Sequence, residues 1–396
     1  MASATRGYAE DALGVKLRNR KRVYGYIWAH HQASRQELVS GLRISLPTVT
    51  QNLNYLQEQG LIDATRQIRY TGGRNATAYT VLPDARRAIG VSLTRNHISV
   101  MSQNLLGEPG TVLRRKMTFK LKSDAYLKKI GAMVEEVRRK DRIREEDLLG
   151  VGVAVPGLVS EDGSVVVDGP TMKFTGTRCE DVCRYVPYRS RMFHDSYTAG
   201  YAEMMSRPEL DNAFYITLGT SVGGSLIYHH TIMDGDHFKA GEVGHTKIVP
   251  KSQKLCYCGQ RGCYDTVGSI TVLDSYTDGD LGEFFRLLKE GDKKAARMWD
   301  TYLGYLATVV HNTWTLFDVP VIIGGYLGTY IDEYIDDLRE RVDALSSHPW
   351  CPASEYVLPS VMKIEPVAAG AARYFIDEFL EGIAIMPEET AEVSAI

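Results

Sequence analysis

Long apolar stretches are missing from this sequence of 396 residues. No run approaches the roughly 20 apolar residues of a membrane-spanning helix, which argues against an integral membrane protein. The segment from Met1 to Leu13 also lacks the apolar core of a secretory signal peptide. With 44% hydrophobic and 24% charged residues, the composition is typical of globular proteins. We therefore expect a cytoplasmic protein without membrane partners, long enough for two or three domains.

Cysteine is scarce, yet half of the six cysteines fall within eight residues: Cys256, Cys258 and Cys263. Gly259 and Gly262 between them allow a short loop to fold back, so that the three sulfurs converge. His245 upstream completes a Cys3His set, which is typical of a closed structural zinc site. Two alternatives remain: three small buried cysteines, or a disulfide that leaves one thiol unpaired and is disfavoured without a secretory signal.

Charge is divided unevenly along the chain, although the formal net charge is only -3. Residues 1–83 carry 11 Lys and Arg against five Asp and Glu, whereas the remaining residues carry 35 against 44. A small basic head on an acidic body favours a polyanionic partner for the head. The alternative is a solvated basic face without a function.

Three helices are expected in the head. The first is predicted over Leu17–His31, with Val23, Ile27 and Trp28 on its apolar face. Ser34 followed by Glu37 has the capping-box spacing that begins a second helix, predicted over Arg35–Ser40.

Ser45 is the predicted cap of the third helix, with Pro47 in its first turn. An apolar stripe at helical spacing predicts its buried face: Val49, Leu53 and Leu56. Polar or small residues near the N-terminus of this helix are expected to face DNA bases: Ser45, Pro47, Thr48, Gln51 and Asn52. Gln and Asn side chains can pair with adenine through two hydrogen bonds.

The segment Leu61–Leu82 alternates and turns at Gly72 and Gly73, which indicates a two-stranded wing. Arg66, Arg69 and Arg74 are expected on or near its tip, where an arginine can enter a minor groove or contact phosphate. A helical hairpin of this length can also be a protein-interaction module, so the pattern alone leaves that alternative open.

The body begins after a short linker over Pro83–Arg87. Strands are predicted over 89–93 and 97–101, with 105–110 as their turn, and over Leu148–Val155 and Val361–Pro366. Helices are predicted over Tyr126–Lys140, Asp280–Lys289, Ala295–Phe317, Tyr330–Leu345 and Ala368–Phe379, the last carrying an Ala-Ala-Gly-Ala-Ala run that allows close packing.

Two of these regions resemble the ROK family of repressors, open reading frames and kinases. Gly-Glu-x-Gly-His at 241–245, followed by Cys-x-Cys-Gly-x-x-Gly-Cys at 256–263, resembles the family signature. The run Ser-x-Pro-Thr-Val-Thr at 45–50 with Gly-Gly-Arg at 72–74 resembles the winged head of the ROK regulators. The resemblance implies an α/β two-lobed actin/hexokinase-like (ribonuclease H-like) body behind an N-terminal winged helix-turn-helix domain. We expect that domain at 1–83, the first lobe at 84–195 plus 365–385, the second lobe with the zinc loop at 196–364, and a tail at 386–396.

The resemblance also implies a sugar site. In the family, Glu242 and His245 correspond to residues that reach sugar hydroxyls, and the His is shared with zinc. Asp195 stands where ROK kinases place a catalytic base and ROK regulators a hydrogen-bonding carboxylate. His194 and Tyr197 replace family Asn residues, and Asp265 replaces a Glu. The expected ligand-binding set is His194, Asp195, Glu242, His245 and Asp265, beside a structural Zn2+ held by His245, Cys256, Cys258 and Cys263.

One family motif is absent. The first hairpin of ROK kinases reads Asp-x-Gly-Gly-Thr and wraps nucleotide phosphates, whereas the segment 88–94 here contains neither the Asp nor Gly-Gly-Thr. Phosphoryl transfer depends on positioning and on charge neutralisation, so a site without this loop is expected to bind ATP poorly. The glycines at 219–224 and 324–325 are interpreted as inherited fold geometry.

We therefore predict a sugar-responsive transcription regulator, more consistent with a repressor than an activator on family grounds, and not an enzyme. Its partners would be operator double-stranded DNA, a sugar or sugar-phosphate effector between the lobes, and a second copy in a homodimer or higher homo-oligomer. The alternatives are an ATP-dependent sugar kinase carrying a DNA-binding head, and a zinc-stabilised scaffold without a small ligand.

Overall fold

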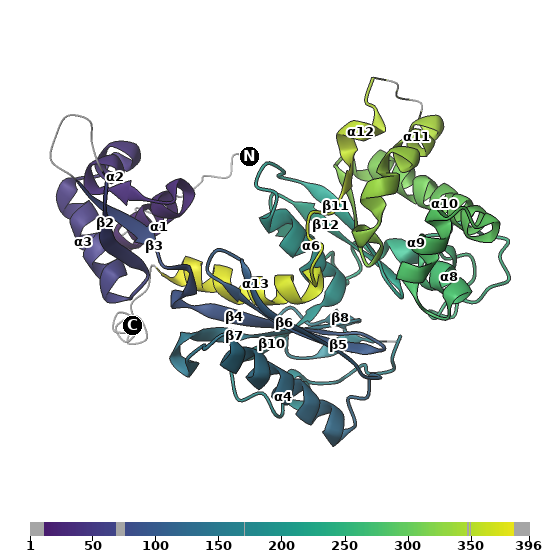
Figure 1. Cartoon of the computed structure of the whole chain (residues 1–396), viewed down its shortest axis with the longest axis horizontal. Helices are drawn as coiled ribbons and strands as arrows, with labels where there is room; N and C mark the ends of the chain where they lie inside the picture. The colour runs from purple at the N-terminus through teal and green to yellow at the C-terminus, as the bar shows by residue number, and fades with distance from the viewer. Residues whose placement is uncertain (1–11, 69–75, 170, 347, 349, 384–396) are drawn as a thin grey trace, which may run out of the picture.

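The computed structural model describes residues 12–68, 76–169, 171–346, 348 and 350–383 (Figure 1). Within these ranges, no helix is both long and apolar enough to cross a membrane. The predicted tail and the wing-tip residues Arg69 and Arg74 lie outside them, and the side chain of Arg66 is likewise not described.

The N-terminal unit consists of three helices and a small sheet: α1 Ala12–His30, α2 Arg35–Leu42, α3 Leu46–Glu58, and strands β1 Ala33–Ser34, β2 Ile62–Ile68 and β3 Ala76–Val81 in the order β1-β3-β2. Ser34 and Glu37 form the predicted capping box at α2, and the Ser45 hydroxyl accepts the Thr48 N–H at α3. The predicted stripe of α3 is fully buried. Trp28 was expected in the apolar face of α1 but is 44% exposed, so that prediction is wrong.

The first lobe is built on a five-stranded sheet in the order β10-β7-β4-β5-β6. Its strands are β4 Arg87–Leu93, β5 His97–Asn104, β6 Pro109–Lys116, β7 Leu148–Val155 and β10 Ser190–His194. Helix α4 (Asp124–Lys140) covers one face of the sheet, and helix α13 (Pro366–Gly382) covers the other (Figure 1). A Cβ atom at Gly90 of β4 would lie 1.8 Å from the Ala368 carbonyl oxygen, so glycine is required where the Ala-rich helix meets the sheet.

The second lobe carries a sheet in the order β13-β12-β11-β14-β15, formed by β11 Ala213–Leu218, β12 Val222–Tyr228, β13 Thr231–Ile232, β14 Val321–Gly325 and β15 Val357–Pro359. The helices of this lobe are α6 Asp195–Met205, α7 Asp265–Gly268, α8 Thr271–Asp274, α9 Leu281–Lys289, α10 Lys293–Phe317, α11 Ile335–Leu345 and α12 Ala353–Tyr356. Short elements complete the first lobe: β8 Leu158–Val159, β9 Val166–Asp168 and α5 Cys179–Val182. Leu316, near the end of α10, is 75% exposed.

Two local predictions for the body are wrong. The turn between β4 and β5 is at 94–96, closed by hydrogen bonds between Thr94 and His97, whereas residues 105–108 lead into the additional strand β6. The strand predicted at Val361–Pro366 is a loop. The backbone N–H groups of Val361 and Met362 bond to the Glu203 carboxylate instead of to a neighbouring strand.

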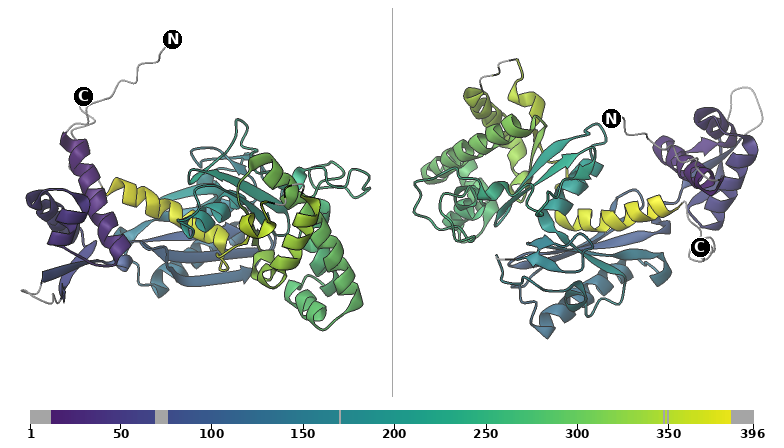
Figure 2. Two further views of the ribbon diagram at one scale, coloured as in Figure 1. Left: turned by 90° about the horizontal axis from the view of Figure 1, so that it is seen from above. Right: turned by 180° about the vertical axis from the view of Figure 1, so that it is seen from behind.

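Helix α13 connects the parts of the molecule. It packs along α6 between the lobes, and a Cβ at Gly370 would lie 1.8 Å from the Thr198 carbonyl oxygen. At its other end, Phe375 and Ile376 share one hydrophobic cluster with the buried residues of the N-terminal unit. Figure 2 shows this end of α13 pointing at that unit in both views.

Candidate metal centre and ligand cleft

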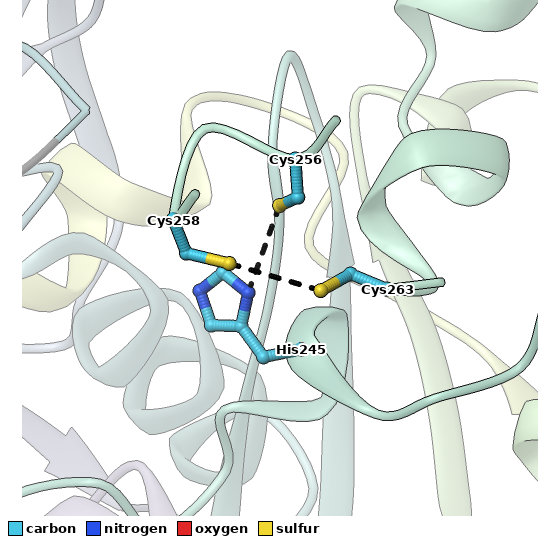
Figure 3. A group of neighbouring side chains, drawn as sticks. All are labelled: His245, Cys256, Cys258 and Cys263. Carbon is cyan, nitrogen blue, oxygen red and sulfur yellow. Dashed lines mark hydrogen bonds between the residues drawn. The ribbon is translucent and has the colours of Figure 1, made fainter. Parts of the chain in front are cut away.

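The four predicted metal ligands converge. One ligand atom from each of His245, Cys256, Cys258 and Cys263 lies within 4.8 Å of the others (Figure 3). His245 comes from a 3-10 turn over Val243–His245, and the cysteines come from the loop that follows. Gly259 and Gly262 have φ of +82° and +79°, the left-handed conformation that lets the loop fold back.

The spacing of these atoms fits a tetrahedral metal ion. The sulfurs of Cys258 and Cys263 are 3.7 Å apart, and the Cys256 sulfur is 3.8 Å from His245 Nδ1. Bonds of ~2.3 Å from a central zinc ion separate two sulfurs by ~3.8 Å at the tetrahedral angle. Lys247 Nζ also lies 3.3 Å from the Cys263 sulfur. The donor set and its geometry are therefore suited to zinc.

Beside this centre lies a cavity of about 450 Å³, which we call the ligand cleft. It is lined by four of the five predicted ligand-binding residues: His194, Asp195, Glu242 and His245. His194 ends β10 and Asp195 begins α6, with His194 Nε2 3.4 Å from the Asp195 carboxylate. On the opposite side, Glu242 lies 3.5 Å from His245 Nε2.

Burial controls the charges in the ligand cleft. It raises the pKa of Asp195 to about 7, with the nearby Glu242 adding to the effect, and it raises the pKa of Glu242. Burial also lowers the pKa of His194 to about 4, so this imidazole is neutral at pH 7. The cleft thus offers hydrogen-bond acceptors and donors of low charge, which suit a ligand with many hydroxyl groups.

Asp265 does not line the ligand cleft. Its side chain is buried, and its carboxylate accepts a hydrogen bond of 2.7 Å from the Val222 backbone N–H at the start of β12. The predicted ligand contact is therefore corrected to a contact that joins the metal loop to the sheet. Sequence reasoning missed Tyr257, which lines the cleft and whose hydroxyl lies 3.1 Å from His245 Nε2. Its position between two of the cysteines is the signal that could have identified it.

A second cavity of about 350 Å³, which we call the upper cavity, adjoins the ligand cleft and shares Asp195, Thr217 and Ser221 with it. Its lining includes Thr220 and Gly325, from the two segments that resemble kinase loops. These are the two segments that we interpret from the sequence as inherited fold geometry.

The upper cavity also contains bulky and charged side chains. Thr94 and Arg95 from the β4–β5 turn line it. Arg114 contacts Glu365 at 3.5 Å, and Lys363 contacts Asp332 at 2.9 Å. Arg114 and Lys363 are thus already paired with carboxylates, which disfavours their use in binding a polyphosphate.

The predicted DNA-facing residues of the N-terminal unit separate into two groups. Ser45, Pro47 and Gln51 are exposed and Thr48 is partly exposed. Asn52 is 1% exposed, and its amide donates to the Thr48 carbonyl oxygen at 2.8 Å, one helical turn back. The prediction that Asn52 faces a base is therefore wrong for this conformation. Arg74 lies outside the described residues.

Known proteins share this architecture. The chain is 23% identical to the xylose repressor of Bacillus subtilis over 388 residues, covering 94% of this chain and 98% of the relative. Among solved structures it resembles a ROK family transcriptional regulator, a homologue of the E. coli MLC protein, with a TM-score of 0.67, 19% identity, and coverage of 93% of this chain and 99% of that one. It also resembles a ROK family glucokinase from Streptomyces griseus with a TM-score of 0.61, 21% identity, and coverage of 73% and 98%. Residues 89–378 match the ROK family itself. With this match over most of its length and the actin/hexokinase-like α/β fold, the chain belongs to the ROK family.

Proposed function

We propose that this protein is a sugar-responsive, DNA-binding transcription regulator, acting as a repressor of carbohydrate-metabolism genes. The observation that carries the proposal is the contrast between the two cavities. The ligand cleft gathers four of the five expected ligand-binding residues, whereas the β4–β5 turn beside the upper cavity does not read Asp-x-Gly-Gly-Thr. The similarity to a xylose repressor across nearly the whole chain supports the same conclusion.

The N-terminal unit would be a winged helix-turn-helix domain with α3 as its recognition helix. Ser45, Pro47 and Gln51 are exposed at the N-terminal half of α3, the part that reads base edges in this motif. The excess of basic residues before residue 84 would supply the contacts to phosphates. Operators with two-fold symmetry call for two such heads, so we propose a homodimer or higher homo-oligomer.

A sugar or sugar phosphate would bind in the ligand cleft. The carboxylates of Asp195 and Glu242 would accept hydrogen bonds from hydroxyls, and His194 and His245 would complete the set. Zinc would be held by His245, Cys256, Cys258 and Cys263, and its contribution when bound is structural. The metal loop then fixes the imidazole of His245 and, through the adjoining turn, the carboxylate of Glu242.

Helix α13 would couple the sugar to the DNA. Gly370 of α13 packs against Thr198 of α6, the helix that begins at Asp195 of the ligand cleft. Phe375 and Ile376 near the other end of α13 pack against the N-terminal unit. The Arg20 guanidinium, which stacks 3.5 Å from the Tyr55 ring centre, also donates to the Ile383 carbonyl oxygen at 3.5 Å. A sugar that favours one arrangement of the lobes would therefore change the position of the heads and the affinity for DNA.

The experiment is selection of duplex DNA from a random library by the zinc-loaded protein, followed by titration with xylose, hexoses, N-acetylated hexosamines and their phosphates. We expect one sugar to weaken binding of the selected DNA by about 5–150-fold, the usual range of allosteric coupling. Selection of no DNA, or an affinity that every sugar leaves unchanged, would contradict the proposal.

Two exposed glutamines of α3 provide a test variant and a matched control for the proposed DNA contact. Gln51→Ala removes a proposed base contact and should weaken the selected site by about 1–3 kcal/mol relative to unrelated DNA. Gln57→Ala, at the other end of the exposed helix surface, should leave this preference unchanged. Equal losses for both variants would place the recognition surface elsewhere.

A sugar kinase with a DNA-binding head is the second candidate. It is favoured by Asp195, which stands at the family's catalytic-base position and whose pKa of about 7 suits a general base. The altered β4–β5 turn argues against it. A coupled assay with ATP, Mg2+ and the sugar that shifts DNA binding distinguishes the two, since turnover would favour the kinase.

A further inference from the structure

A pair of cysteines lies apart from the metal centre. Cys179 begins α5, Cys183 caps its end, and their sulfurs are 3.9 Å apart. Cys179 is partly exposed, whereas Cys183 is 8% exposed. Residues four apart in a helix are separated by about 6 Å along its axis, which is within the Cα spacing of ~4.4–6.8 Å that a disulfide accepts. A small rotation of the two side chains can therefore bring the sulfurs into bonding distance.

The two thiols differ in their surroundings. The hydrogen bond with Cys183 lowers the pKa of Cys179, and the Met192 backbone N–H and the Arg191 guanidinium lower it further, against the opposing effect of burial. The same hydrogen bond and burial raise the pKa of Cys183. Cys179 is thus the accessible, thiolate-forming partner and Cys183 the buried, protonated partner, which is the arrangement of a reactive and a resolving thiol.

We propose that Cys179 and Cys183 form a dithiol site that hydroperoxides oxidise to a reversible disulfide. The Cys179 thiolate attacks the terminal oxygen of the peroxide, the O–O bond breaks, and the other oxygen leaves and takes up a proton as water or an alcohol. The Cys183 sulfur then attacks the sulfenic acid on Cys179, and the hydroxyl group leaves as water with the Cys183 proton. Two thiols lose two electrons in total, and one peroxide gains them.

The location of the pair gives the oxidation a structural consequence. Arg191 lies on β10, the strand that ends at His194 and leads into Asp195. Its guanidinium stacks 4.8 Å from the ring centre of Tyr374 on α13. Disulfide formation removes the ionisable thiol that interacts electrostatically with Arg191, so the modification acts on the strand that supplies the ligand cleft. The chemistry itself does not depend on whether the chain binds DNA or sugar.

The test uses the full-length, zinc-loaded protein. It is treated with hydrogen peroxide, quenched with iodoacetamide and digested with trypsin for mass spectrometry. Cleavage after Arg178 and Arg184 releases both cysteines in one peptide, 179–184. The proposed metal ligands and Cys351 fall in other peptides. We expect peptide 179–184 to lose two hydrogens and both alkylation sites, and dithiothreitol to restore them.

Cys351 is the internal control. It is partly exposed, and burial raises its pKa, so it should remain alkylated at peroxide concentrations that convert most of peptide 179–184. Oxidation of Cys351 at the same rate, or full alkylation of Cys179 and Cys183 after treatment, would overturn the proposal.

Variants assign the two roles. In Cys183→Ser the sulfenic acid on Cys179 has no resolving partner, so dimedone should label Cys179. In Cys179→Ser, Cys183 should stay unlabelled because it is buried and protonated. Equal dimedone labelling of the two single variants would refute the assignment, and the wild-type peptide analysis remains decisive if either variant folds poorly.

Discussion

The two cavities between the lobes share a wall that includes Asp195 and Thr217, yet they differ in the side chains opposite it. The ligand cleft faces Glu242 and His245, held beside a cluster of metal-binding type. The upper cavity faces Thr94 and Arg95 of the β4–β5 turn, and two of its other cations, Arg114 and Lys363, are paired with carboxylates. This contrast is why we separate the proposed recognition of a sugar from its phosphorylation.

Loss of the proposed zinc should have the largest effect, because the ion would hold the whole loop that borders the ligand cleft. Structural zinc sites contribute binding free energies of about 10–16 kcal/mol in small domains. Between residues 246 and 261 only Cys256 is buried, so little apolar burial would replace that contribution. We expect Cys263→Ser, or chelation, to lower the Tm strongly and to abolish sugar binding, as measured by calorimetry and metal analysis. Cys351→Ser should retain both properties. A Cys263→Ser protein that binds sugar normally would show that the loop needs no metal.

The next largest effect is expected when one carboxylate is removed from the ligand cleft, compared with removal of one from the upper cavity. Glu242→Gln replaces one carboxylate oxygen of the ligand cleft by an amide that cannot accept a hydrogen bond, and leaving a buried hydrogen-bonding partner unsatisfied costs about 1–3 kcal/mol. We expect sugar affinity, measured by titration calorimetry, to fall by about 10–100-fold. The matched variant Glu365→Gln removes a carboxylate that contacts Arg114 in the upper cavity and should leave sugar affinity unchanged. Equal losses would mean that the ligand spans both cavities.

The sequence predicted some parts of the ligand cleft and its metal loop better than others, for physical reasons. The metal loop was predictable because Cys256, Cys258, Cys263 and two glycines lie close together in the chain, so local spacing determines their geometry. His194 and Asp195 reach the same cleft from a strand far away in the sequence, and they were found only through a family resemblance. Asp265 was misassigned because the choice between ligand and backbone N–H depends on where the β12 backbone lies, which is a tertiary feature.

Outside the cleft, too, local sequence pattern predicted some helices and strands correctly but failed where distant contacts decide the structure. The caps at Ser34 and Ser45 and the strand Leu148–Val155 were predicted correctly from local pattern. Asn52 was assigned to the wrong surface because its amide competes for a carbonyl of its own helix. The loop after β15 resembled a strand, since the distant, buried Glu203 that bonds its N–H groups leaves no trace in local sequence.

The titration of Asp195 gives a pH test of the ligand cleft. Its pKa is raised from 3.8 to about 7 by burial, so the folded state binds the proton more tightly than the unfolded state. This contribution to stability is fully present below about pH 4 and is lost as the pH rises through about 7. We expect Asp195→Asn, which cannot ionise, to gain stability relative to the wild type between pH 5 and pH 8, measured by urea unfolding. A difference between the two proteins that is constant over this range would contradict the burial of this carboxyl.

The smallest effect is expected from a substitution that makes the β4–β5 turn of the upper cavity more similar to the phosphate loop of ROK kinases. Arg95→Gly removes a side chain from the turn that lacks the family's glycines, and Arg95 does not line the ligand cleft. Sugar affinity should therefore remain within about twofold of the wild type, a change of less than 0.5 kcal/mol. ATP binding should still be undetectable by thermal shift, because one glycine restores neither the missing Asp nor the free cations that phosphoryl transfer needs. If Arg95→Gly alone brought ATP binding and sugar phosphorylation, Arg95 would be the only side chain that keeps ATP out of the upper cavity. The protein would then be better described as a kinase held inactive by Arg95.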